Sequence, residues 1–166
     1  TALGMFALSA EDTGSANTAL GYAALNALNY NGTGYNVAVG HEAGAVMTTG
    51  VENVLIGALA GDSLTSGSYN VAIGHGALDQ EDSGGRNVAV GYLTLTAQDA
   101  GADAYNVAMG YMAGTAVTTG VQNTIIGGLT GDALTTGQYN VAIGTYALTT
   151  EDTGSKATAI GFGTLA

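Results

Sequence analysis

Carboxylate side chains come closest to forming a chemical site in this sequence. Adjacent acidic residues recur at regular intervals, as Glu11-Asp12, Glu81-Asp82 and Glu151-Asp152. Pairs of this kind can serve as general acid and base in glycoside cleavage, or bind calcium together with turn carbonyls. The other acidic turns that could bind calcium are Gly61-Asp62 and Gly131-Asp132. The glycine-rich nonapeptide spacing of calcium-bound β-rolls is absent from all of these turns. We expect solvated turns, and predict no catalytic residue, no metal site and no cofactor.

The two histidines are the other residues that could bind a metal ion. His41 and His75 each directly follow a glycine, but the equivalent residues later in the chain are Tyr111 and Thr145. A metal site needs further close ligands, and the sequence places none beside either histidine. We interpret both as single surface histidines.

Aromatic and histidine residues at one recurring position form the candidate ligand-binding column. They directly follow the glycine of a repeated phrase and are Tyr22, His41, His75, Tyr92, Tyr111 and Phe162. Such rings combine an apolar body with a polar tip and could stack on sugar faces. Packing between coils or chains is the alternative. A second column, Tyr35, Tyr69, Tyr105 and Tyr139, alternates with Glu52, Arg86, Gln122 and Lys156, and we expect it to be partly solvated.

A repeat that fills the chain must position these residues. Phrases of the type Asn-Val-Ala-Ile-Gly recur at spacings of 19 or 17 residues, as from Gly21 to Gly40 and from Gly40 to Gly57. A block of four coils occurs twice, at 21–90 and 91–160. Partial coils occupy 1–20 and 161–166. We expect one repeat-built segment, and a piece of a longer fibre, because the chain opens and stops within the repeat without the polar caps of an independent solenoid.

The repeat predicts strands stacked into a rod. Glycine costs about 1 kcal/mol relative to alanine inside a helix and recurs here every few residues, which excludes helices. Thr-Gly and Ser-Gly turns suit a glycine with positive φ. The predicted fold is all-β, a parallel β-solenoid (β-roll) of about ten 17- or 19-residue coils. Stacked coils of this kind rise about 4.8 Å each.

Alternation within the phrase assigns two faces to each strand. We expect Val and Ile to point into the solenoid, and Asn, Ala and Gly to point outward. Leu55 and Ile125 replace the usual alanine in the same coil of each block. Both strand faces are then apolar, as in strands buried on both sides. We therefore predict that Leu55 and Ile125 lie in an oligomer interface.

Composition narrows the possible partners. The chain has 2 basic and 13 acidic residues and a net charge of −11. Nucleic acid is excluded as a partner because phosphate binding needs clustered Lys and Arg. Apolar runs are shorter than the about 20 residues of a spanning helix, so we expect no membrane insertion. Without cysteine the chain has no disulfides or thiolate ligands.

The phrase resembles those of a known class of fibrous proteins. Asn-Val-Ala-Ile-Gly at 70–74 and 140–144, with Gly-x-x-Ala-Leu and Thr-Thr-Gly between copies, is similar to the head repeats of trimeric autotransporter adhesins and to repeats of bacteriophage tail fibres. The resemblance implies parallel β-rolls, a homotrimer, an extracellular location, and contact with a glycan or protein receptor. We expect an attachment fibre, with the phage fibre favoured over the bacterial adhesin.

Two other functions compete with the fibre. An ice-binding solenoid would need threonines aligned on one face, but Thr48-Thr49, Thr118-Thr119 and Thr135-Thr136 are adjacent, so their side chains diverge in an extended segment. A polysaccharide-cleaving tailspike would need carboxylates clustered along one groove. We expect neither, and we predict that the chain is not an enzyme.

Overall fold

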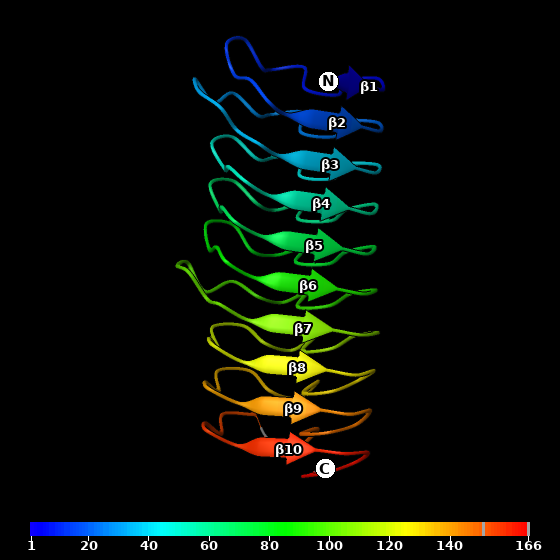
Figure 1. The fold of residues 1–166 in the computed structure, drawn as a ribbon, viewed down its shortest axis with the longest axis vertical. Helices are drawn as coiled ribbons and strands as arrows, with labels where there is room; N and C mark the ends of the chain where they lie inside the picture. The colour runs from blue at the N-terminus through cyan, green and yellow to red at the C-terminus, as the bar shows by residue number, and fades with distance from the viewer. Residues whose placement is uncertain (151, 166) are drawn as a thin grey trace.

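Residues 1–150 and 152–165 are described by the computed structural model, and they form a single ten-stranded parallel sheet wound as a solenoid (Figure 1). The strands follow one another in chain order from β1 to β10. Their bounds are β1 Ala2–Leu3, β2 Thr18–Leu20, β3 Val37–Val39, β4 Val54–Ile56, β5 Val71–Ile73, β6 Val88–Val90, β7 Val107–Met109, β8 Thr124–Ile126, β9 Val141–Ile143 and β10 Thr158–Ile160. The predicted all-β parallel solenoid is confirmed.

Equivalent residues of successive phrases pair with one another across the sheet. In β4 and β5, for example, Val54 is opposite Val71, Leu55 opposite Ala72 and Ile56 opposite Ile73. The longer coils keep this register, because their additional residues lie in the turns that protrude before β3 and β7 (Figure 1). Every position of the phrase therefore forms a straight column along the rod.

The phrase glycine ends each strand and allows the coils to stack. Gly74 has a φ of 135°, and a Cβ at this position would fall on the carbonyl group of Gly91 in the next coil. Only glycine combines that φ with so close a backbone approach. The strands are consequently shorter than the phrase, with two residues in β1 and three in β5.

The prediction of which strand face is internal is wrong. The middle residue of the strands β2 to β10 is buried, and so are the phrase asparagines from Asn17 to Asn140. Val and Ile on either side point outward and keep part of their surface exposed. The strands contribute mainly alanine and asparagine to the interior, and most of the larger buried residues, such as Leu25, Met47 and Leu64, come from the rest of the coil.

Leu55 and Ile125 are therefore internal residues, which corrects their assignment to an oligomer interface. Both have 0% exposed surface. Cβ atoms placed on Gly44 and Gly61 would lie 2.6 and 2.9 Å from the Leu55 side chain. Other coils have leucine at the position of these glycines, such as Leu25 and Leu78. One large strand residue thus fills the space left by two glycines, and Ile125 does the same beside Gly114 and Gly131.

Asparagine side chains form an unbroken internal ladder. The Oδ1 atom of each phrase asparagine accepts the backbone N–H of the equivalent residue in the next coil; Asn70, for example, donates to Asn53 at 2.9 Å. The Nδ2 atom of Asn70 also donates to the Gly84 carbonyl at 3.0 Å. Buried polar groups are costly unless paired, so these bonds explain how asparagine can occupy the interior.

Candidate interaction surfaces

The outward side of the sheet is a continuous apolar surface, which we call the outer sheet face. It consists of the first and third residues of the strands: Thr18, Val37, Val54, Val71, Val88, Val107, Thr124, Val141 and Thr158, with Leu20, Val39, Ile56, Ile73, Val90, Met109, Ile126, Ile143 and Ile160. None of these residues is charged. Each lies in intermediate or exposed surroundings, so the protomer itself leaves this face uncovered.

Aromatic rings or histidines directly follow the glycine that ends six of the ten strands, and we call this column the aromatic ladder. The ring of Tyr22 stacks on His41 with centroids 5.1 Å apart and planes 15° apart. His75, Tyr92 and Tyr111 form a second stack, with centroid distances of 5.6 and 5.5 Å. The structure thus joins five of the six predicted ligand-binding residues into two stacks on the surface.

Phe162, the sixth predicted residue, pairs with a ring that the sequence analysis did not include. Its partner Tyr146 lies 5.9 Å away in an edge-on arrangement, and Phe6 meets Tyr22 in the same way at 5.8 Å. Phe6 and Tyr146 occupy the second position after the phrase glycine and have φ angles of 63° and 60°. A search of both positions after the glycine would have found them.

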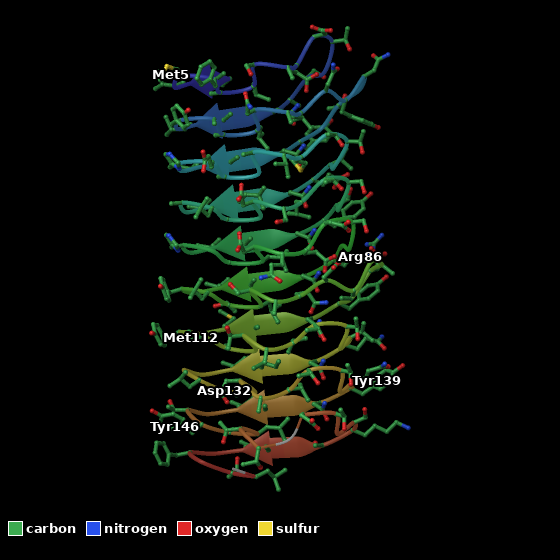
Figure 2. All side chains as sticks on the ribbon, turned by 180° about the vertical axis from the view of Figure 1, so that it is seen from behind. Met5, Arg86, Met112, Asp132, Tyr139 and Tyr146 are labelled. Atoms are coloured by element: carbon green, nitrogen blue, oxygen red, sulfur yellow. The ribbon has the colours of Figure 1, made fainter. Side chains whose placement is uncertain are left out.

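The second column lies at the opposite edge of the rod, where Figure 2 shows Arg86 and Tyr139 across from Tyr146. The Arg86 guanidinium lies over the ring of Tyr69, 4.5 Å from its centroid, and 5.7 Å from that of Tyr105. It also pairs with Asp103 at 2.7 Å. The tyrosines of this column are exposed, as expected, but the faces of Tyr69 and Tyr105 toward Arg86 are occupied by the cation.

One acidic pair is not the solvated turn that we expected. Glu81 is completely buried, whereas Asp82 is exposed. The Glu81 carboxylate accepts the backbone N–H groups of Gly84 at 2.8 Å and Ala100 at 3.4 Å. Burial raises the pKa of Glu81, although the hydrogen bonds from Gly84 and Ala100 lower it, and Asp99 and Asp82 raise it further.

The 19-residue coil between Gly91 and Gly110 supplies the Ala100 N–H that binds the buried Glu81. Asn87 precedes this coil, and its Nδ2 atom has no hydrogen-bond partner, unlike that of Asn70. Glu11 and Asn17 are the equivalents of Glu81 and Asn87 near the start of the chain, and there the Nδ2 atom of Asn17 donates to Glu11 at 3.4 Å. Both glutamates thus accept polar hydrogens where the longer turn changes the hydrogen-bond pattern. Glu151 of the third pair lies outside the described residues.

Carboxylate oxygens of Glu81, Asp82 and Asp99 do approach within 4.8 Å of one another. The most buried of them, Glu81, is already bound to backbone N–H groups. Among the described residues, the buried side-chain polar atom without a partner is Nδ2 of Asn87, which is a hydrogen-bond donor and cannot ligate a cation. The cluster therefore has the bonding pattern of a structural glutamate.

Threonines in the turns have their hydroxyls directed to the neighbouring coil. Thr48 donates to the Thr65 carbonyl at 3.1 Å, and Thr135 donates to the Asp152 carbonyl at 2.9 Å. These hydroxyls reinforce the coil stack. The first threonine of each adjacent pair, Thr48, Thr118 and Thr135, is thus bonded within the coil stack.

Within the described part of the chain, no helix is long and apolar enough to span a membrane. No protein-family model, no curated protein and no solved structure matches this chain.

Proposed function

We propose that this chain is a structural and adhesive segment of an extracellular or virion fibre that attaches to a host or surface. Three copies associate through their outer sheet faces, and the aromatic ladder contacts the receptor. The phage tail fibre is our preferred setting, with the bacterial surface adhesin as the alternative. One observation supports the proposal above all: an uncharged apolar sheet face that runs the length of the rod.

Parallel sheets are normally covered on both faces, and large apolar patches on soluble proteins mark interaction sites. Here the inner face is covered by the rest of each coil, whereas the outer sheet face has no cover. It extends over the nine strands from β2 to β10, roughly 40 Å at the usual strand spacing. A partner for this face must be long, straight and apolar.

Another copy of the same chain meets these requirements. Its strands have the same spacing, so its Val and Ile columns can interdigitate with those of the first copy rung by rung. The net charge of −11 would oppose association of identical chains. The acidic residues lie outside the strands, however, and the outer sheet face itself has none. Three copies rather than two is what the resemblance to trimeric fibre repeats implies.

Light scattering tests the assembly directly. We expect a molar mass three times the 16.3 kDa of the protomer. Ile73→Asp places a charge at the centre of the outer sheet face and should yield a folded monomer. Gln80→Asp, at an exposed turn position, is the matched control and should remain trimeric.

Circular dichroism on the same samples shows whether the Ile73→Asp chain keeps its β-structure. A wild-type chain that is folded and monomeric at every concentration, or an Ile73→Asp variant that is folded and still trimeric, would refute the proposal.

A further inference from the structure

A single position in the chain has an asparagine followed directly by a glycine. This pair, Asn31-Gly32, lies in the protruding turn before β3 (Figure 1). Asn31 is exposed to solvent. An asparagine before a glycine can lose its side-chain amide without an enzyme, because no side chain shields the glycine nitrogen that attacks the asparagine Cγ atom. Whether the reaction proceeds depends on how firmly the fold holds these two groups.

The asparagines of the repeated phrase are protected from this reaction by the coil stack. All eight, from Asn17 to Asn140, are buried. The Oδ1 atom of each accepts a backbone N–H from the next coil. The attacking nitrogen is bound as well: the N–H of Val71, which follows Asn70, donates to the Asn87 carbonyl at 2.8 Å. Both reacting groups of a phrase asparagine are therefore fixed in the ladder between coils.

The surroundings of Asn31 differ from those of every other asparagine. The N–H of Gly32 donates to the Tyr30 carbonyl at 2.7 Å, which closes a three-residue turn and does not tie this nitrogen to another coil. Two other asparagines lie outside the phrase. The Oδ1 atom of Asn26 accepts a hydrogen bond, and Asn29 precedes a tyrosine, whose side chain hinders the attack. Only one asparagine thus combines an exposed amide with an unhindered nitrogen.

We propose that Asn31 is a site of spontaneous covalent modification, at which water converts the asparagine to aspartate and isoaspartate as the chain ages. The Gly32 nitrogen loses its proton to solvent base and attacks Cγ of Asn31. The new C–N bond closes a cyclic imide, and the side-chain amide takes up a proton and leaves as ammonia. Water then opens the imide, at Cγ to give aspartate or at the backbone carbonyl to give isoaspartate. No oxidant or reductant takes part.

Isoaspartate lengthens the main chain by one carbon beside the contact that fixes the long turn. The Gly32 carbonyl accepts the Ser15 N–H at 2.9 Å, and the Gly34 N–H donates to the Ser15 carbonyl at 3.0 Å. These bonds form the isolated bridge between the turn and the preceding coil. The register of the strands is secured separately, since the Asn36 N–H donates to Oδ1 of Asn17 at 3.1 Å. The modification therefore loosens the turn and leaves the strands in place.

Mass spectrometry of the aged protein tests the site. The full chain is kept at neutral pH and physiological temperature for several weeks and is digested at mildly acidic pH, which limits further conversion. Isoaspartate is quantified by enzymatic methylation of its free α-carboxyl group. We expect Asn31 to convert many-fold faster than any phrase asparagine, and to convert faster as the pH rises, because the attacking nitrogen must lose a proton. An unconverted Asn31, or equal conversion of the phrase asparagines, would overturn the proposal.

Val71→Gly separates the effect of the sequence from that of the fold. It places a glycine after the buried Asn70, so the same pair of residue types then lies in the ladder. In the folded variant Asn70 should convert many-fold more slowly than Asn31, and in denaturant the two rates should become similar. Equal rates in a variant that keeps its β-structure by circular dichroism would contradict the protection by the coil stack.

The second long turn offers the converse test, because Gly101-Ala102 replaces the pair there. Gly101 has a φ of 64°, a conformation in which asparagine is enriched among non-glycine residues. Gly101→Asn combined with Ala102→Gly moves the pair into this exposed turn. We expect conversion there at a rate similar to that of Asn31. A transplanted pair that stays unconverted would show that exposure in a long turn is not sufficient.

Hydrogen exchange tests the structural consequence of the modification. In the isoaspartate chain we expect faster exchange of the Ser15 and Gly34 amide hydrogens, and unchanged exchange at Asn36. Asn31→Asp is the matched control, because it adds the negative charge without lengthening the main chain, and it should keep the slow exchange at Ser15. Unchanged protection of Ser15 in the isoaspartate chain would refute the loosening of the turn.

Discussion

Polarity does not separate the inner face of the strands from the outer face. Leu55 and Ile56 are neighbours in β4, yet Leu55 is completely buried and Ile56 is 37% exposed. Asparagine, a polar residue, is inside, and valine and isoleucine are outside. Leucine and isoleucine are equal in size, so the position in the coil separates this pair: Leu55 fills the space left by Gly44 and Gly61, whereas Ile56 points outward.

The largest expected difference in stability is between the alanine variants of Leu55 and Ile56. Leu55→Ala opens a cavity beside Gly44 and Gly61 and should lower the free energy of unfolding by about 2–5 kcal/mol. Ile56→Ala removes a half-exposed side chain and should lower it by well under half as much. Chemical denaturation followed by circular dichroism measures both changes.

Both substitutions are best compared in the Ile73→Asp background, so that subunit dissociation does not contribute to the measured unfolding. Equal losses for Leu55→Ala and Ile56→Ala in that monomeric background would contradict the assignment of the inner face.

A smaller difference should separate two rungs of the asparagine ladder. Asn70→Ala removes the acceptor of the Asn87 N–H and the donor to the Gly84 carbonyl, and each buried group left unpaired costs about 1–3 kcal/mol. Asn87→Ala also removes the acceptor of the Asn106 N–H, but it eliminates an Nδ2 atom that has no partner. We therefore expect Asn87→Ala to be less destabilising by about 1 kcal/mol or more.

Thermal unfolding of the two alanine variants side by side measures this difference. If Asn87→Ala proved the more destabilising of the two, the ladder as described would be wrong at the long coil.

The smallest expected effect concerns the buried Glu81. Its pKa in the folded chain is raised above the ordinary value of 4.5, so its contribution to stability is fully present below about pH 4.5 and is lost as the pH rises through the folded-state pKa. Glu81→Gln removes this dependence and can still accept a hydrogen bond from Gly84. Relative to the variant, the wild-type chain should lose stability as the pH rises above 4.5.

Unfolding midpoints at several pH values, at constant ionic strength, measure the dependence. Asp82 and Asp99 face the same carboxylate and remain in the variant. Parallel pH profiles for wild type and Glu81→Gln would show that this group titrates alike in the folded and unfolded chain.

Most of the fold could be predicted from the sequence, because spacing determines it. The nearly constant interval between phrase glycines predicted the coil and the parallel pairing. The alternation of residues within the phrase is symmetric, however, and shows that two faces differ without showing which is internal. The inner face could have been recognised from its low sequence variation. Asn and Ala hardly vary along the chain, as expected for positions on the inner side of the strands.

The candidate site was predictable only in part. The aromatic column follows from a single repeated position, so the sequence locates it. The edge-on contacts of Phe6 with Tyr22 and of Tyr146 with Phe162 come from the second position after the glycine, and they form only when the coils are stacked. The burial of Glu81 depends on how the longer turn redirects the N–H of Ala100, a consequence of backbone geometry that composition does not reveal.

Stacking in register also determines how the rod responds to a pulling force. Backbone hydrogen bonds between coils, such as those from Val71 to Asn87 and from Gly74 to Ile56, run along the axis of the rod. Tension along that axis therefore loads the boundary of one coil at a time, and each coil that detaches adds roughly 50 Å of extended chain. A solenoid built this way yields to a sudden load in steps, and dissipates energy while both of its ends stay attached.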